Sequence, residues 1–229
     1  MINKEKIVNY VKKQNKGLST HKIGNINVFI KDKLINDIDI DTVFSKIDKL
    51  LPDHILELVD VVYLGHFDFL TEKSVNATYM DGAIYTSNIQ DNEKDLLDDI
   101  IHEFSHASEE KYGQFIYDDG NIENEFLLKR SRLKRILSYQ KHDIQHLDFS
   151  NIEYDSIFDS VMYKTIGYNA LRMLAKNLFL APYSINSLKE YFARGFEEFY
   201  LGNKVYLKSM CPYLYNELLN LHEEYIEEF

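Results

Sequence analysis

A strong helical period over residues 95–113 constrains the fold more than any other feature of this chain. The segment reads DLLDDIIHEFSHASEEKYG, and its apolar side chains recur every three or four residues, at Leu97, Ile100, Ile101, Phe104 and Ala107. This spacing predicts an amphipathic helix that buries one face in a hydrophobic core. Asp91 or Asn92 can cap the start of the helix, and Gly113 can end it.

Strand and turn signals precede this helix. Asp81-Gly82 separates two β-rich runs in NATYMDGAIYTSN, and a type I′ hairpin turn favours this pair because both of its central residues need a positive φ. We therefore expect strands at about 75–80 and 83–87. The other elements predicted in this half are strands at 26–30 and 57–65 and helices at 4–14 and 41–51, with Asp41 as the cap of the second helix.

The second half of the sequence is predicted to be helical. Its helices are expected at about 122–139, 155–179, 186–201 and 212–227. Strands followed by a run of helices indicate an α+β fold. We expect one unit made of two lobes: residues 1–113 with a small mixed sheet and the helix described above, and residues 114–229 as a mainly helical lobe.

Composition and charge argue against several classes of protein. The 229 residues are 45% hydrophobic and 14% aromatic, which is typical of a folded globular chain. The formal net charge of −11 argues against a nucleic-acid partner, because proteins that bind nucleic acid usually carry a basic face. The basic run KRSRLKR at 129–135 has helical spacing and is interpreted as a solvated helix face that could contact an acidic partner.

Sequence signals of location favour the cytoplasm. The single cysteine, Cys211, cannot form an intramolecular disulfide. The first residues lack the continuous apolar region of a classical signal peptide, and no run of about 18 apolar residues could span a membrane. We expect a cytoplasmic protein; export by another route and packaging in a larger assembly stay open, and the oligomeric state is not predicted.

The same amphipathic helix carries residues that suit a metal ion. His102 and His106 are four residues apart, so both imidazoles lie on one face and can reach one ion. This face differs from the apolar stripe and includes Asp95 and Asp99. Glu103 would lie beside the ion, where it can take a proton from water and pass it to a leaving amine. The spacing predicts one Zn²⁺ ion; the alternative is an exposed polar face that happens to hold two histidines.

A catalytic zinc usually has three protein ligands, so a third ligand must come from elsewhere in the chain. Glu190, near the start of the helix predicted at 186–201, is the candidate. Spacing leaves a structural role equally open, because Ser187 and Glu190 have the positions of a capping box. His142 and His146 are also four residues apart, but they lie in loop-like sequence and are interpreted as surface histidines.

Two motifs resemble a known family. HEFSHASEEKYG and the later YSINSLKEYFARGFEEFY are similar to the zincin metallopeptidases of the anthrax lethal factor and Pro-Pro endopeptidase family, specifically at about 95–113 and 181–220. The resemblance implies a zincin-like fold and a zinc-dependent endopeptidase that hydrolyses a peptide or protein substrate. The family's third zinc ligand, in a segment of the type Glu-aromatic-Phe-Ala-x-x-Phe, maps onto Glu190 in EYFARGF. Its oxyanion-facing tyrosine, seven residues earlier, maps onto Tyr183.

The chain departs from that family in two respects. The segment between the two motifs is longer, so residues 114–180 form an inserted or enlarged helical part. Arg194 stands where the family often has a second acidic residue that orients a histidine ligand. Glu197, one turn further on, can replace that residue or pair with Arg194. Arg194, Glu197 and Asp99 are therefore the candidates for orienting the metal ligands.

The substrate is expected to bind beside a strand. Ala83, Ile84, Tyr85 and Thr86, in the strand at 83–88, are predicted to form the upper edge of the cleft, where an extended peptide could add by backbone pairing. The alternative is an ordinary edge strand. Two other classes of function stay open: a binding or structural protein that keeps the zincin fold without catalysis, and an aminopeptidase or amidase that uses the same metal chemistry.

Overall fold

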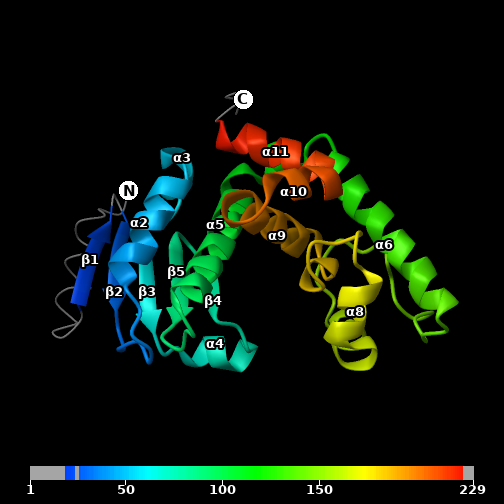
Figure 1. Ribbon diagram of the computed structural model, residues 1–229, viewed down its shortest axis with the longest axis horizontal. Helices are drawn as coiled ribbons and strands as arrows, with labels where there is room; N and C mark the ends of the chain where they lie inside the picture. Colours follow the sequence, from blue (N-terminus) through cyan, green and yellow to red (C-terminus); the bar gives the residue numbers. More distant parts are fainter. Residues whose placement is uncertain (1–18, 24–25, 224–229) are drawn as a thin grey trace. The chain divides into compact units, whose positions relative to one another are not determined.

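The computed structural model describes residues 19–23 and 26–223, which form a mixed α+β fold (Figure 1). The chain divides into two compact units, residues 1–104 and 105–229. The boundary between them falls inside one long helix, α5, whereas the predicted lobes divide further along the same helix. The helix predicted at 4–14 lies outside the described residues.

Five strands form one sheet in the described part of the first unit, in the order β1-β2-β3-β5-β4. They are β1 (Ser19–Ile23), β2 (Ile26–Ile30), β3 (Val61–Gly65), β4 (Ala77–Met80) and β5 (Ala83–Ser87). The central strands β2, β3 and β5 run parallel, and β1 and β4 are antiparallel to their neighbours. The strand predicted at 26–30 is confirmed, the one predicted from residue 57 begins only at Val61, and β1 was not predicted.

The predicted hairpin is confirmed, but the predicted edge strand is wrong. Asp81 and Gly82 have φ angles of 49° and 79°, as a type I′ turn requires. The strand that follows, which holds Ala83, Ile84, Tyr85 and Thr86, pairs with β3 on one side and with β4 on the other. The edge strand is therefore β4. Local sequence could not reveal this arrangement, because the parallel pairing with β3 joins segments far apart in the chain.

The strand register separates two kinds of side chain onto the two faces of the sheet. On one face, direct partners across three strands are fully buried: Val28, Val62 and Ile84. On the other face, the rings of Phe29, Tyr63 and Tyr85 stack in a row, with centroids 5.6 and 5.1 Å apart. The aliphatic face thus belongs to the hydrophobic core, and the aromatic row stabilises the opposite face.

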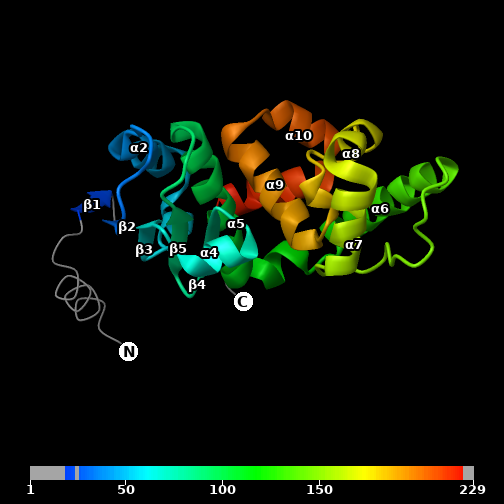
Figure 2. The same ribbon diagram turned by 90° about the horizontal axis from the view of Figure 1, so that it is seen from below.

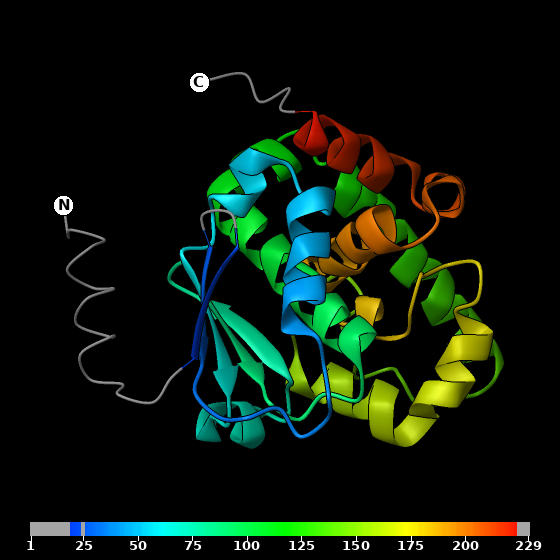
Figure 3. The same ribbon diagram turned by 60° about the vertical axis from the view of Figure 1, so that its left-hand side comes forward.

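Helix α2 (Ile40–Leu50) lies alongside the sheet (Figure 3) and buries Val43, Phe44 and Ile47. Its cap is Asp39 rather than the predicted Asp41, because a carboxylate oxygen of Asp39 accepts a hydrogen bond from the Thr42 backbone N–H at 3.1 Å. Two short helices of this unit were not predicted: α3 (Asp53–Leu56) and α4 (Asp68–Lys73).

Helix α5 spans Glu93–Tyr117 and confirms the helical period of the sequence. The side-chain oxygen of Asn92 caps it by accepting from the backbone N–H groups of Lys94 and Asp95 at 2.9 and 3.1 Å. Every member of the predicted apolar stripe is buried: Leu97, Ile100, Ile101, Phe104 and Ala107. The prediction that Gly113 ends the helix is wrong, since the helix continues past it.

The described part of the second unit is helical. Its helices are α6 (Asn121–Tyr139), α7 (Ser156–Ser160), the π-helix η1 (Val161–Gly167), α8 (Tyr168–Leu174), η2 (Tyr183–Ile185), α9 (Leu188–Leu201), α10 (Lys204–Met210) and α11 (Pro212–His222). The helix predicted at 155–179 is interrupted by η1, whose last residue, Gly167, turns the chain with a φ of 90°. Helix α10 was not predicted. None of the described helices is long and apolar enough to cross a membrane.

Buried polar contacts hold α9 against its neighbours. Helix α9 packs against α6, α10 and α11 (Figure 2). The Tyr191 hydroxyl of α9 donates to one carboxylate oxygen of Glu125 on α6 at 2.6 Å, and the backbone N–H of Tyr213 on α11 donates to the other at 3.1 Å. One buried carboxylate thus ties three helices together and fixes the position of α9.

The basic run at 129–135 is only partly solvated, so the prediction of a solvated face is wrong at its start. Lys129 is buried and donates to the Met210 carbonyl at 2.7 Å. Arg130 is also buried, and its guanidinium lies 4.0 Å from the centroid of the Phe158 ring. Both cations can be buried because each finds acceptors or an aromatic face within the unit.

We predict that Gly195→Ala lowers the free energy of unfolding by about 1–3 kcal/mol through overpacking. An added Cβ would lie 2.3 Å from Cδ2 and 2.9 Å from Cγ of Leu214, which is fully buried. The matched control is Gly113→Ala in α5, where an added Cβ meets nothing within 4 Å. That variant should gain up to about 1 kcal/mol from helix propensity. Urea unfolding measures the free energy of unfolding of both variants. A Gly195→Ala variant that is more stable than the wild type would contradict the close packing of Gly195 against Leu214.

Candidate metal centre

Three predicted metal ligands come together. Ligand atoms of His102, His106 and Glu190 lie within 4.8 Å of one another, and all three residues are partly buried. The two histidines are one turn apart on the continuous helix α5. Glu190 lies in the first turn of α9, in the same unit as His106. The residues that the sequence motifs pair are therefore neighbours in space.

This set of donors suits zinc. Two imidazole nitrogens and one carboxylate oxygen form a common catalytic zinc site, with a fourth position left for water or substrate. In a tetrahedral site with bonds of about 2.0–2.1 Å, the ligand atoms are about 3.3 Å apart. The candidate ligand atoms lie within 4.8 Å of one another, and rotation about the side-chain bonds can change these separations.

Glu109 fixes the orientation of His106. The Nδ1 atom of His106 lies 3.1 Å from a carboxylate oxygen of Glu109, whose side chain is almost fully buried. An ionised carboxylate can only accept, so Nδ1 carries the proton and the Nε2 lone pair is available to a metal ion. The hydroxyl of Tyr117 donates to the other oxygen of Glu109. Burial, together with the Glu109 charge, raises the pKa of Tyr117 well above its usual value, which keeps that donor protonated.

Sequence reasoning missed Glu109 and Tyr117. A usable signal was present, because Glu109 follows His106 by three residues and this spacing brings side chains together on a helix. The predicted orienting residues were Asp99, earlier on the same helix, and Arg194 and Glu197 on the helix of the third ligand. Helix α5 therefore carries both a candidate metal ligand and a carboxylate that can orient it.

Asp99 lies one turn before His102 on α5, as predicted. Its carboxylate accepts a hydrogen bond from the Gln90 side chain at 3.0 Å. Burial raises the pKa of Asp99 to about 6, and the nearby His102 acts in the opposite direction. The two side chains therefore interact electrostatically, and a role of Asp99 in orienting His102 stays a prediction.

The pairing of Arg194 with Glu197 is confirmed. The guanidinium of Arg194 contacts the carboxylate of Glu197 three residues on and lies 3.6 Å from that of Glu198. Arg194, at a position where the family that the motifs resemble often has an acidic residue, thus pairs with two carboxylates. The proposal that Arg194 itself orients a metal ligand receives no support from these contacts.

Glu103 is held by the edge strand of the sheet. Its side chain is buried, and its carboxylate accepts a hydrogen bond from the Tyr79 backbone N–H at 2.6 Å. Tyr79 belongs to β4, which pairs with β5 on one side only. The outward edge of β4 therefore faces the predicted general base, and β4 takes the place that the sequence assigned to β5.

Tyr183 is exposed on an otherwise buried and anchored segment. It begins the short helix η2, and its residue is 48% exposed although both of its chain neighbours are buried. The segment is tied to α7 by the Asn186 side chain, which donates to Asp159 at 2.6 Å. A rigid segment that presents one exposed tyrosine suits a hydroxyl that must be held in place.

The capping box and the metal site do not exclude each other. The hydroxyl of Ser187 accepts from the Glu190 backbone N–H at 3.2 Å and so caps α9. This cap uses the backbone of Glu190, whereas a metal ion would use its carboxylate. His142 and His146 were predicted to be surface histidines. The side chain of His146 is 51% exposed, and its Nδ1 atom lies 3.9 Å from a carboxylate oxygen of Asp143, which agrees with that prediction.

We predict that Glu190→Ala removes stoichiometric zinc, because the site would keep only two protein ligands. Ser187→Ala is the matched control: it should cost about 1 kcal/mol of stability through the lost cap and leave zinc bound. Elemental analysis of purified protein measures the first effect and thermal unfolding the second. Full zinc content in the Glu190→Ala variant would show that Glu190 has only a structural role.

Comparison of the chain with models of known protein families, with curated proteins and with solved structures found no match. The functional interpretation therefore depends on the geometry of the candidate metal centre and on the two motifs. Among these, the grouping of His102, His106 and Glu190 is the observation that carries the most weight.

Proposed function

We propose that this chain is a zinc-dependent endopeptidase with a zincin-like fold. The observation that carries this proposal is the grouping of His102, His106 and Glu190, which come from two motifs far apart in the sequence. The mixed sheet beside the helix that bears both histidines also supports it. The buried Glu103 adds the group that distinguishes a hydrolytic site from a purely structural one.

A zinc ion held by these ligands would lower the pKa of water to about 7 and polarise the carbonyl of the substrate. Glu103 then takes the proton from the attacking water and delivers it to the leaving amine. The hydrogen bond from the Tyr79 N–H holds the Glu103 carboxylate in a fixed position during both transfers. A peptide that paired with the outward edge of β4 would lie beside this carboxylate.

Tyr183 would donate a hydrogen bond to the oxyanion of the tetrahedral intermediate. Its exposed ring on an anchored segment supports this role, because a donor that does not move costs no reorganisation during the reaction. Its position seven residues before Glu190, as in the related family, is the second observation in favour.

We predict that Glu103→Gln keeps zinc and lowers peptide cleavage by about 10²–10⁴-fold, since the amide can still accept the Tyr79 hydrogen bond but cannot take a proton. Mass spectrometry of a digested peptide library, with zinc content measured in parallel, checks this. Glu110→Gln, an exposed position on the same helix, is the control. Unchanged cleavage would remove Glu103 as the base. If the wild type cleaves only at peptide ends, it is an aminopeptidase. If the zinc-loaded wild type cleaves no peptide, the chain is a binding protein.

We predict that Tyr183→Phe lowers kcat by about 10²-fold, which is typical for the loss of one oxyanion donor, while zinc content and KM change little. Tyr139→Phe, at a fully solvated position on α6, serves as the control. Steady-state kinetics on one peptide cleaved by the wild type gives the values. A wild-type kcat in the Tyr183 variant would exclude the hydroxyl from the reaction.

A further inference from the structure

A cavity of about 620 Å³ lies in the second unit, within the size range of pockets that bind ligands. One wall comes from α8 and the turn that follows it. The opposite wall comes from Ala181, Pro182, Arg194 and Tyr206. Helix α8 belongs to the 114–180 segment, which is longer than expected from the family that the two motifs resemble.

Cations line this cavity, and no carboxylate does: the three are Arg172, Lys176 and Arg194. Arg194 is neutralised by its contacts with Glu197 and Glu198. Arg172 and Lys176 are exposed, and neither has a carboxylate partner among the residues that the structure describes. In a chain with a net charge of −11, two uncompensated positive charges in one cavity favour an anionic group there.

The cavity also has an apolar surface. Tyr168, Met173 and Tyr206 are 44%, 78% and 41% exposed, and all three line it. The buried Phe179 contributes a further apolar contact. A small inorganic anion would use only the two charges, whereas an amino-acid side chain with a methylene stem and a carboxylate would contact both kinds of surface.

Two connections along the chain link this cavity to the candidate metal centre. Ala181 and Pro182 line the cavity and directly precede Tyr183, the proposed oxyanion donor. Arg194 lines it from α9, one helical turn after Glu190, so the two side chains lie on the same face of the helix. A peptide held at Tyr183 and Glu190 would therefore have a neighbouring residue within reach of the cavity.

We propose that this cavity binds an acidic side chain of the peptide substrate and so selects where the chain is cut. This inference rests on the proposed peptidase function. A glutamate or aspartate carboxylate would accept charge-assisted hydrogen bonds from Arg172 and Lys176. A neutral side chain would forgo these bonds, and a basic one would be repelled by the same two charges.

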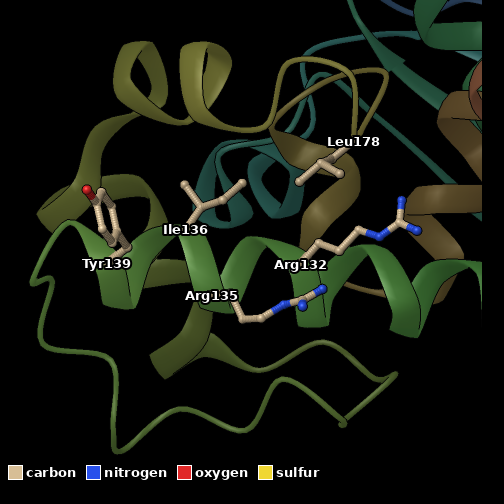
Figure 4. A pocket seen from close by; sticks show the side chains of 5 residues that line it. All are labelled: Arg132, Arg135, Ile136, Tyr139 and Leu178. Atoms are coloured by element: carbon tan, nitrogen blue, oxygen red, sulfur yellow. The ribbon is translucent and has the colours of Figure 1, made fainter.

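A second cavity provides a matched control. It measures about 450 Å³ and is lined by Arg132, Arg135, Ile136, Tyr139 and Leu178. Figure 4 shows both arginines on α6, with Leu178 facing that helix from the segment after α8. This cavity is also lined by two cationic side chains, but neither α9 nor the residues just before Tyr183 line it. Arg132→Gln with Arg135→Gln therefore removes the same charge from the chain as Arg172→Gln with Lys176→Gln.

The test measures binding on the zinc-loaded Glu103→Gln background, which holds peptides without cutting them. The probes are fluorescein-labelled peptide libraries that differ only in whether one fixed position holds Glu or Gln, with that position moved along the peptide. By fluorescence anisotropy, Glu at one position should bind about tenfold tighter than Gln. Arg172→Gln with Lys176→Gln should abolish this preference, and Arg132→Gln with Arg135→Gln should keep it.

Equal binding of the Glu and Gln libraries at every position, or an equal loss of preference in both double variants, would overturn the proposal. Digestion of the same libraries by the wild type separates it from the proposed function. Cleavage without a preference for Glu would support the peptidase function and contradict the binding of an acidic side chain in this cavity. Selective binding of Glu without any cleavage would support the cavity's role and contradict the peptidase function.

Discussion

The helical period of α5 is the constraint on which the candidate site depends. Burial of Ile100, Ile101 and Phe104 leaves the face that carries His102 and His106 no freedom to rotate. The same helix supplies Glu109, whose buried carboxylate sets the tautomer of His106. The spacing of the two candidate histidine ligands, the orientation of His106 and the packing of the core thus depend on one helix. A change that loosens its buried face would also disturb the candidate metal centre.

The second half of the site depends on a helix that is fixed by different forces. Helix α9 is capped by Ser187 and tied to two other helices through the carboxylate of Glu125. Glu190 therefore projects from the first turn of a helix with little freedom to move. Tyr183 lies on the anchored segment before it. Within the second unit, the groups that the catalytic proposal uses therefore lie on a capped helix and on an anchored segment.

Local patterns predicted most of the longer elements, and long-range contacts explain two of the errors. The hairpin at Asp81-Gly82 and the apolar stripe of α5 follow from nearest neighbours, and both are confirmed. The prediction that β5 is an edge strand was wrong, because its parallel partner, β3, comes from a distant segment of the chain. The burial of Lys129 also depends on such a contact, with Met210. Spacing alone could not decide whether Glu190 is a metal ligand or part of a capping box. Only the family resemblance or the structure could group it with the two histidines.

Zinc X-ray absorption spectroscopy on the zinc-loaded protein tests the central claim most directly. If His102, His106 and Glu190 hold the ion, elemental analysis should find one zinc per chain, and the spectrum should show nitrogen and oxygen ligands at about 2.0–2.1 Å with the multiple scattering of two imidazoles. His102→Ala and His106→Ala should each remove one imidazole from the fit or release the ion. A shell of oxygen alone, a sulfur ligand, or a zinc content that does not respond to either substitution would contradict it.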